Sequence, residues 1–173
     1  MSEVATAQHL FERLRDWAER EDFASLVGEL GAGVNGEASA PAADAEAGRG
    51  MVRRYFEMWN TGDRTEADAV LGATYLDHAH PSVVGPAAVR SLVRRFRAEN
   101  PEARMVVEIV VYDPEYVIVR RAIRWSERGP MEACGVALFR VAGGQLAEQW
   151  SWPATGERGD GASEARAALG NYF

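Results

Sequence analysis

Three groups of residues in this 173-residue sequence have side chains that can move protons or hold a charge. The first is the run Asp77-His78-Ala79-His80, in which histidine titrates near neutral pH and a neighbouring carboxylate can orient it. We predict that His78 transfers a proton, that Asp77 orients it or acts as a base, and that His80 contacts a substrate. The alternative is a turn in which Asp77 caps the backbone and both histidines are structural.

The second group lies near the end of the last expected strand. Alternation along a strand places Glu148, Trp150 and Trp152 on one face. A carboxylate between large aromatic side chains loses hydration, which raises its pKa toward the range of a general acid. We therefore predict Glu148 as a third catalytic residue and both tryptophans as substrate contacts. The alternative is a glutamate on an edge strand that faces water.

The third group is a set of arginines on one expected strand. Arg120 and Arg124 alternate to the same face, and Arg121 points to the other. A guanidinium inside a pocket would hold a carboxylate or enolate oxygen, and we predict this role for Arg120 and Arg124. The alternative is a row of exposed arginines paired with strand acids such as Glu108.

These side chains need elements to position them, and the first part of the chain has helical periodicity. Tyr55 and Trp59 are four residues apart on one helix, so they share a face and are predicted to line a pocket as well as to pack the core. The expected elements here are helices at about 50–60, from Thr65 and from Gly85 to about 99, with an extended segment at 74–80.

After residue 104 the apolar period becomes two, which indicates strands. The expected strands are 105–112, 116–126, 131–141 and 145–152. Helices followed by strands predict an α+β fold, here a cone in which N-terminal helices pack on a curved sheet. We expect that sheet to be mainly antiparallel, with four to six strands, and to enclose a small-molecule pocket.

The chain divides into four parts by composition. Residues 1–30 have an amphipathic helical pattern, and residues 31–50 are rich in Ala, Gly, Glu and Asp and are predicted to be a flexible linker. Residues 51–153 form the predicted domain, and residues 154–173 a polar tail. The leading helix either docks a partner or packs on its own domain.

Composition also limits the classes of function. A net charge of −7 argues against a nucleic-acid partner, and the absence of lysine excludes Schiff-base chemistry. No apolar run approaches the roughly 18–20 residues that span a bilayer, so we expect a cytoplasmic protein without membrane contact. His78 and His80 have no third histidine or cysteine nearby, and we predict no metal and no cofactor.

The central strands are apolar on both faces, which favours a sheet that is buried on both sides. We therefore expect a homodimer through the sheet face that the helices leave open, unless the N-terminal helix covers it. The residues expected on that outer face are Val107, Ile109, Val111, Val117, Val119 and Ile123.

Four stretches of the sequence carry a recognisable pattern. They are Tyr55-Phe-x-x-Trp59-Asn60-x-Gly62-Asp63, then Tyr75-x-Asp77-His78 followed by Gly85 and a helix, then Val117-Ile-Val-Arg120, and last Phe139-Arg140-Val141-x-Gly143-Gly144-x-Leu146-x-Glu148-x-Trp150. Together these stretches resemble the SnoaL-like polyketide cyclase family. The resemblance covers about residues 51–152, and its last stretch is the most specific. It implies the cone-shaped fold of nuclear transport factor 2 and ketosteroid isomerase.

The sequence departs from this family where the chemistry is concerned. Family cyclases are expected to carry acids directly after the closing tryptophan, one of which serves as general acid or base in aldol ring closure. Here Ser151 and Trp152 follow Trp150, so the family's acid after the tryptophan is missing and its role cannot be assigned to Ser151.

Two kinds of function agree with these observations. One is a cofactor-independent cyclase, isomerase or hydratase of specialised, polyketide-like metabolism, acting on a small and mostly apolar substrate; epoxide opening, which needs an acid pair around an arginine, is a variant. The other is a protein of the same fold that binds such a metabolite, or serves as an accessory subunit, without converting it.

Overall fold

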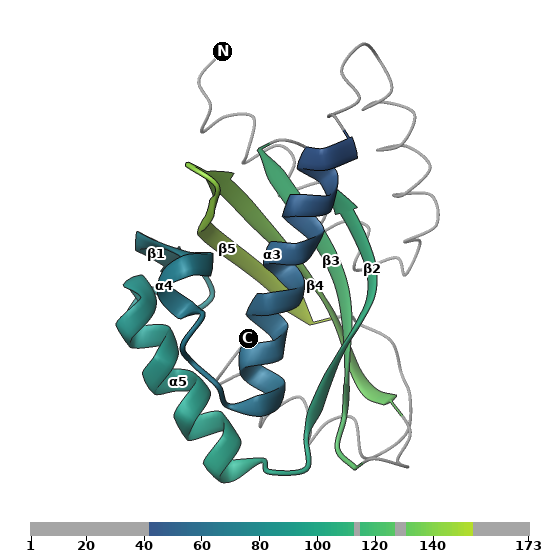
Figure 1. Ribbon diagram of the computed structural model, residues 1–173. Helices are drawn as coiled ribbons and strands as arrows, with labels where there is room; N and C mark the ends of the chain where they lie inside the picture. Colours follow the sequence, from purple (N-terminus) through teal and green to yellow (C-terminus); the bar gives the residue numbers. More distant parts are fainter. Residues whose placement is uncertain (1–41, 113–114, 127–130, 154–173) are drawn as a thin grey trace.

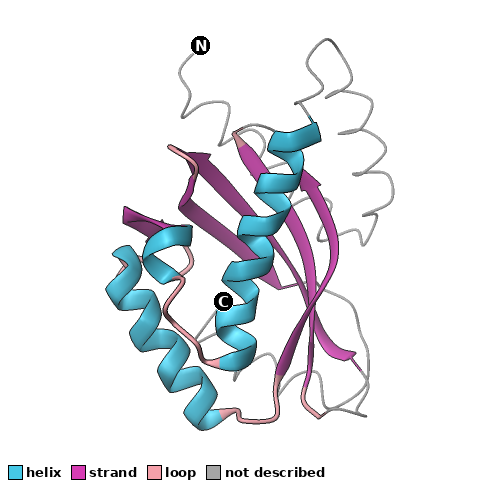
Figure 2. Ribbon diagram, viewed as in Figure 1, coloured by secondary structure: helices cyan, strands magenta, loops and turns pink. Residues whose placement is uncertain are grey.

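In the part of the chain that the structure describes, three helices lie against one face of a five-stranded sheet (Figures 1 and 2). The structure, a computed structural model, describes residues 42–112, 115–126 and 131–153. The elements are α3 (Ala42–Thr61), α4 (Ala67–Val70), β1 (Leu71–Asp77), α5 (Gly85–Glu99), β2 (Arg104–Tyr112), β3 (Tyr116–Arg124), β4 (Met131–Ala142) and β5 (Gln145–Pro153). The predicted α+β class is confirmed, and the four long strands lie within two residues of their expected bounds.

The sheet has the strand order β1-β5-β4-β3-β2. The last four strands form an antiparallel meander, and β1 pairs parallel to β5 at the far edge. This pairing brings the end of β1, which carries Asp77, next to Gln149 of β5. Two segments that are about seventy residues apart in the sequence therefore meet at one place in the sheet.

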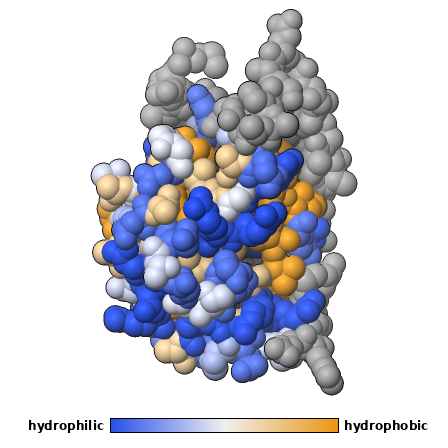
Figure 3. Space-filling model, viewed as in Figure 1, coloured by the Kyte–Doolittle hydropathy of each residue, from blue (hydrophilic) through white to orange (hydrophobic). Residues whose placement is uncertain are grey.

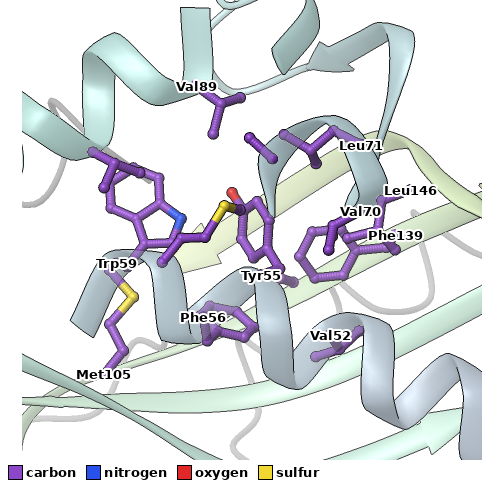
Figure 4. Close-up of a cluster of buried hydrophobic side chains, with 14 of the residues drawn as sticks. Val52, Tyr55, Phe56, Trp59, Val70, Leu71, Val89, Met105, Phe139 and Leu146 are labelled. Carbon is purple, nitrogen blue, oxygen red and sulfur yellow. The ribbon is translucent and has the colours of Figure 1, made fainter. Parts of the chain in front are cut away.

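Helix α3 supplies the largest side chains of the core (Figure 4). Its apolar residues recur at steps of three and four, so Val52, Tyr55, Phe56 and Trp59 all point toward the sheet and are buried. The ring of Tyr55 meets that of Phe139 on β4 edge-on, with centroids 5.2 Å apart. These aromatic contacts fix the helix over the sheet and hold the Tyr55 hydroxyl in the interior.

The first described helix begins earlier than expected. Helix α3 starts at Ala42, so the prediction of a flexible linker is wrong for residues 42–50. Alanine is the commonest residue of its first turns, and its high helix propensity extends a helix that is anchored by its buried second half. The predicted N-terminal helix, the remainder of the linker and the C-terminal tail lie outside the described residues.

The second expected helix is short. It is the single turn α4, with Glu66 rather than Thr65 at its N-cap, and Leu71 already belongs to β1. The side chain of Asp63 accepts hydrogen bonds from both the amide and the hydroxyl of Thr65, at 3.0 and 2.9 Å. Because Thr65 is held in this turn, it does not cap the helix.

Strand β5 contains a bulge that decides which of its side chains face the helices. Val141 of β4 pairs with Leu146, but the preceding residue, Arg140, pairs with Glu148, so Ala147 is an extra residue. Leu146 and Gln149 are buried on the inner side, toward α3. Glu148 and the residues that alternate with it therefore lie on the outer side.

The outer side of the sheet carries a second apolar cluster, separate from the core under the helices. Its buried members are Tyr116, Ile118, Val136 and Leu138, and Val111, Trp150 and Trp152 pack against them. Val107, Val117, Val119 and Ile123 belong instead to the core or pack against it, so their predicted place on the outer face is wrong. Odd-numbered residues of β3 point inward, which the alternation alone did not decide.

Among the described residues, no helix combines the length and the apolar character that crossing a membrane requires.

Candidate functional site

A group of polar side chains is buried between α3 and the inner face of the sheet. We call Tyr55, Tyr75, Asp77, Arg121 and Gln149 the interior polar cluster. Gln149 is 1% exposed, Asp77 3% and Arg121 5%. Buried polar groups are costly unless they are hydrogen-bonded, and a cluster of five in one place marks a candidate site.

Two tyrosine hydroxyls in this cluster meet at one oxygen atom. The hydroxyl of Tyr55, on α3, donates a hydrogen bond of 2.8 Å to Oε1 of Gln149. The hydroxyl of Tyr75, on β1, donates one of 2.6 Å to the same oxygen. The amide nitrogen of Gln149 in turn donates to the Ser151 hydroxyl at 2.7 Å. Three elements thus build a site in which two donors converge on a single acceptor.

Both phenols stay protonated far above neutral pH. Burial, reinforced by the charge of Asp77, raises the pKa of Tyr55 to about 12. Burial also raises the pKa of Tyr75 well above its usual value, and the neighbouring Tyr55 and Asp77 act in the same direction. The pair is therefore a fixed source of two neutral hydrogen-bond donors in a mostly apolar interior.

Arg121 brings a positive charge to the same cluster. It lies on β3 opposite Gly135 of β4, and a side-chain carbon at Gly135 would come within 3.7 Å of its guanidinium. Burial lowers the pKa of Arg121 to about 10, while the charges of Tyr55 and Asp77 act in the opposite direction. The guanidinium is thus a cation at neutral pH that balances Asp77 inside the core.

Asp77 orients His80. Its Oδ1 accepts the backbone amides of Ala79 at 2.9 Å and His80 at 3.3 Å, and its Oδ2 lies 3.1 Å from Nδ1 of His80. The expected turn and the expected orienting carboxylate are thus both present, but the oriented ring is His80 rather than His78. A buried carboxylate on Nδ1 fixes the position of an imidazole that can act as a base.

His80 also lines an open cleft of about 780 Å³ beside α5. The face of the molecule on which α3 and α5 lie is mostly hydrophilic (Figure 3). The other residues around this cleft are Ser82, Val83, Ala88, Ser91, Leu92, Arg94, Arg95 and Ala98. The contact between Asp77 and His80 therefore joins the interior polar cluster to this cleft.

His78 and Glu148 do meet, but on the outer side of the sheet. His78 Nε2 and Glu148 Oε2 are 2.7 Å apart, and Arg140 Nε donates to Glu148 Oε1 at 2.7 Å. The His78 ring stacks on Trp150, with centroids 4.3 Å apart. The bulge at Ala147 places Glu148 and Trp150 on this side, because without it both side chains would share the inner face with Leu146.

The prediction of a raised pKa for Glu148 is wrong. Partial burial alone would raise it, but hydrogen bonds from His78 and Arg140, together with their charges, outweigh this effect. The pKa of the carboxyl is therefore below its usual value, and Glu148 does not have the properties of a general acid.

The arginine that enters the interior is Arg121. Arg120 Nε lies 3.2 Å from Oε2 of Glu108, and by alternation Arg120 and Arg124 both face outward. Trp150 and Trp152 also lie on the outer side, whereas Tyr55 and Trp59 face inward as predicted. Tyr75 and Gln149 were missed, although the even spacing between Tyr75 and Asp77 was a signal for the former.

Among the described residues, no three side chains of His, Cys, Asp or Glu gather closely enough to hold a metal ion.

Comparison with known proteins supports the family resemblance. Residues 52–149 match the model of the SnoaL-like domain. No curated protein matches the chain significantly. Solved structures that resemble it include a SnoaL-like polyketide cyclase from Agrobacterium tumefaciens, with 16% identity, coverage of 68% of this chain and 94% of that one, and a TM-score of 0.52.

Two further structures are similar to this chain. The first is TsrD from Streptomyces laurentii, with 16% identity, coverage of 75% and 98% of the two chains, and a TM-score of 0.56. The second is an NTF2-like protein of unknown function from Mesorhizobium loti, with 19% identity, coverage of 62% and 91%, and a TM-score of 0.51. At these identities the likeness concerns the fold. The domain match covers more than half of the sequence, and the chain belongs to the SnoaL-like family.

Proposed function

We propose that this chain is a cofactor-independent enzyme of the cyclase or isomerase type, acting on a small, mostly apolar carbonyl compound of polyketide-like metabolism. The observation that carries the proposal is the convergence of the Tyr55 and Tyr75 hydroxyls on one oxygen at 2.8 and 2.6 Å. Two neutral donors at one point are what an enolate oxygen requires. The polyketide cyclase among the similar structures agrees with this choice of substrate class.

In this reaction the substrate oxygen accepts hydrogen bonds from both phenols. His80, oriented by Asp77, removes the proton from the carbon next to the carbonyl, and the electrons of the C–H bond form the enolate. Arg121 stabilises the negative charge that develops in the interior. Where the enolate is conjugated with a C=C bond, return of the proton from His80 to the far carbon of that bond gives isomerisation. Where the enolate carbon attacks a second carbonyl, a C–C bond forms, and the new alkoxide takes the proton back from His80 to give ring closure.

Exchange of α-protons tests this proposal without knowledge of the natural substrate. Wild-type protein is incubated in D₂O with a panel of cyclic ketones and 1,3-diketones, and proton loss is followed by NMR. We expect faster exchange for at least one compound, and a loss of about 10²–10³-fold in Tyr55→Phe and in Tyr75→Phe. The matched control is Arg120→Gln, on the outer face beside Arg121, which is expected to keep the wild-type rate.

The second candidate is a protein that binds the same class of compound without converting it. It is favoured by the closed hydrogen bonding of the cluster, in which Gln149 already accepts both phenols. Saturable binding of panel compounds without any exchange would establish this function instead. Epoxide opening has less support, because Asp77 is the one buried carboxylate among the described residues and Glu148 lies on the outer side.

A further inference from the structure

The carboxamide of Gln149 occupies the point where the proposed enzyme would bind its substrate oxygen. Its Oε1 accepts both tyrosine hydroxyls, and its Nε2 donates to Ser151 Oγ at 2.7 Å. The oxygen and nitrogen of an amide lie in one plane with the carbon between them. The cluster is therefore complementary to a planar group with an acceptor on one side and a donor on the other.

We propose that Gln149 is an internal stand-in for the substrate, and that the substrate class is a planar carbonyl group with a neighbouring O–H or N–H donor. Carboxamides and lactams have this arrangement. The carbonyl oxygen takes the place of Oε1 between Tyr55 and Tyr75, and the donor takes the place of Nε2 on Ser151. The carboxamide of Gln149 turns away when such a group binds. The binding of such a group does not depend on the proposed function, and only its conversion by the protein rests on that proposal.

Replacement of the Gln149 carboxamide by the substrate is favourable once the substrate is an enolate. A neutral amide oxygen and a neutral ketone oxygen are similar acceptors, so the ground-state substrate gains little over Gln149. An enolate oxygen is charged, and hydrogen bonds to a charged acceptor are roughly twice as strong. Displacement of Gln149 therefore favours the enolate over the ketone, and a simple ketone without the second donor leaves Ser151 without its partner.

A cavity variant tests the proposal directly. Gln149→Ala removes the carboxamide and leaves the two phenols and Ser151 in place. The probes are acetamide, the six-membered lactam 2-piperidone and, as a ketone of the same ring size without a donor, cyclohexanone. We expect acetamide and the lactam to raise the melting temperature of Gln149→Ala, with an apparent Kd at least tenfold lower than in wild-type protein. Cyclohexanone is expected to bind at least tenfold more weakly to the variant than the lactam does.

Two controls separate this site from general effects of the probes. Glu148→Ala, the neighbouring residue on the outer face, is expected to behave as wild type. Adding Tyr55→Phe and Tyr75→Phe to Gln149→Ala is expected to abolish the stabilisation by acetamide. Equal response of all variants, or no preference for the donor-bearing probes, would overturn the proposal.

A second measurement does not depend on the folding of the cavity variant. In wild-type protein with ¹³C-labelled tyrosine, saturating 2-piperidone is expected to shift the ring-carbon signals of Tyr55 and Tyr75, and unchanged signals would contradict the inference. The outcome is separate from that of the exchange assay. If the probes bind but no α-proton exchange occurs, the binding site is supported and the proposed enzyme activity is contradicted. If exchange occurs but the probes do not bind, the enzyme activity is supported and this inference is contradicted.

Discussion

At the scale of single residues, the interior polar cluster combines neutral and charged side chains that are all buried. Tyr55 and Tyr75 are held neutral, whereas Arg121 and Asp77 bring opposite charges to the same interior. Buried charge pairs are weak contributors to stability, because desolvation cancels much of their attraction. Their presence under α3 is better explained by function than by stability, and it has measurable consequences.

The first prediction concerns stability at high pH. Below pH 10 the phenols are protonated in both the folded and the unfolded chain, so their contribution to the free energy of unfolding does not change with pH. Above pH 10 the unfolded chain loses protons that folded Tyr55 keeps until about 12, so the free energy of unfolding falls with pH. Tyr75 acts in the same direction. Arg121 acts oppositely, because its pKa near 10 lies below the unfolded value.

Because two phenols oppose one arginine, the cluster as a whole is expected to make the free energy of unfolding fall with pH above pH 10. Urea denaturation at pH 9, 10 and 11 measures how the free energy of unfolding changes with pH. Comparison with a variant cancels the contribution of all other titrating groups. Tyr55→Phe is expected to lose stability less steeply than wild type, with half-buried Tyr112→Phe as the control. Identical slopes for wild type and Tyr55→Phe would show that this phenol titrates normally.

The second prediction concerns the shared hydrogen-bond acceptor. Gln149→Leu keeps the volume but leaves two buried hydroxyls without their acceptor, at a cost of about 1–3 kcal/mol for each. Tyr75→Phe alone is expected to cost about 0.5–1.5 kcal/mol. In the Gln149→Leu background the same tyrosine change is expected to be neutral or stabilising. A double-mutant cycle by urea denaturation checks this, and simply additive costs would argue against the shared acceptor.

At the scale of elements, the turn from β1 into α5 positions the Asp77–His80 pair. Asp77 N donates to Val83 O at 3.2 Å, and His80 N donates to Asp77 O at 3.1 Å, so the segment folds back on itself before the helix. Gly85 starts the helix with φ +73°, and an added Cβ would lie 2.8 Å from the carbonyl oxygen of Ala73. Only glycine adopts this geometry without strain.

The third prediction follows from this turn. Gly85→Ala is expected to destabilise the protein by at least about 1–2 kcal/mol, the cost of a left-handed conformation in a residue with a side chain. The matched control is Gly143→Asn, in the β4–β5 hairpin, where φ is +58° and nothing lies within 4 Å of the added carbon. Asparagine suits that turn, so we expect a change within about 0.5 kcal/mol. Thermal or urea unfolding of both variants decides whether the two glycines differ.

At the scale of the whole molecule, the sheet is apolar on both faces. The helices cover the inner face, and the outer cluster around Leu138 is fully buried as well, although α3, α4 and α5 all lie on the other side. We propose that a second copy of the chain associates through this outer face. The half-buried side chains at the margin of this cluster, Val111, Trp150 and Trp152, are the apolar groups that such a contact would remove from water.

The fourth prediction is the oligomeric state. Light scattering on the full chain at micromolar concentration is expected to give twice the mass of one chain. Trp152→Arg, at the half-buried margin of the outer cluster, is expected to shift the equilibrium toward the monomer by introducing a charge there. Ala87→Arg, at an exposed position of α5 on the other side of the sheet, serves as the charge-matched control. A monomeric wild type would mean that the chain itself covers this face.

Much of the fold was determined by the sequence alone. The change of apolar period near residue 104 gave the order of helices and strands, because burial of one face imposes a period of 3.6 on a helix and of two on a strand. Helix α3 could also be anticipated in its buried half, although its start at Ala42 could not, because alanine-rich segments fit a helix and a linker equally well. Tyr55 and Trp59 were placed correctly for the same reason, since both follow the apolar stripe.

The composition of the site was decided only by the tertiary structure. A period of two fixes which side chains share a face but not which face is the inner one, so Arg121 could not be chosen over Arg120. The extra residue Ala147 then exchanged the faces of β5, bringing Gln149 to the interior and Glu148 to the outside. The parallel pairing of β1 with β5 joined Tyr75 and Asp77 to them. Bulges and long-range strand pairing depend on contacts between distant segments, which local patterns of residues do not contain.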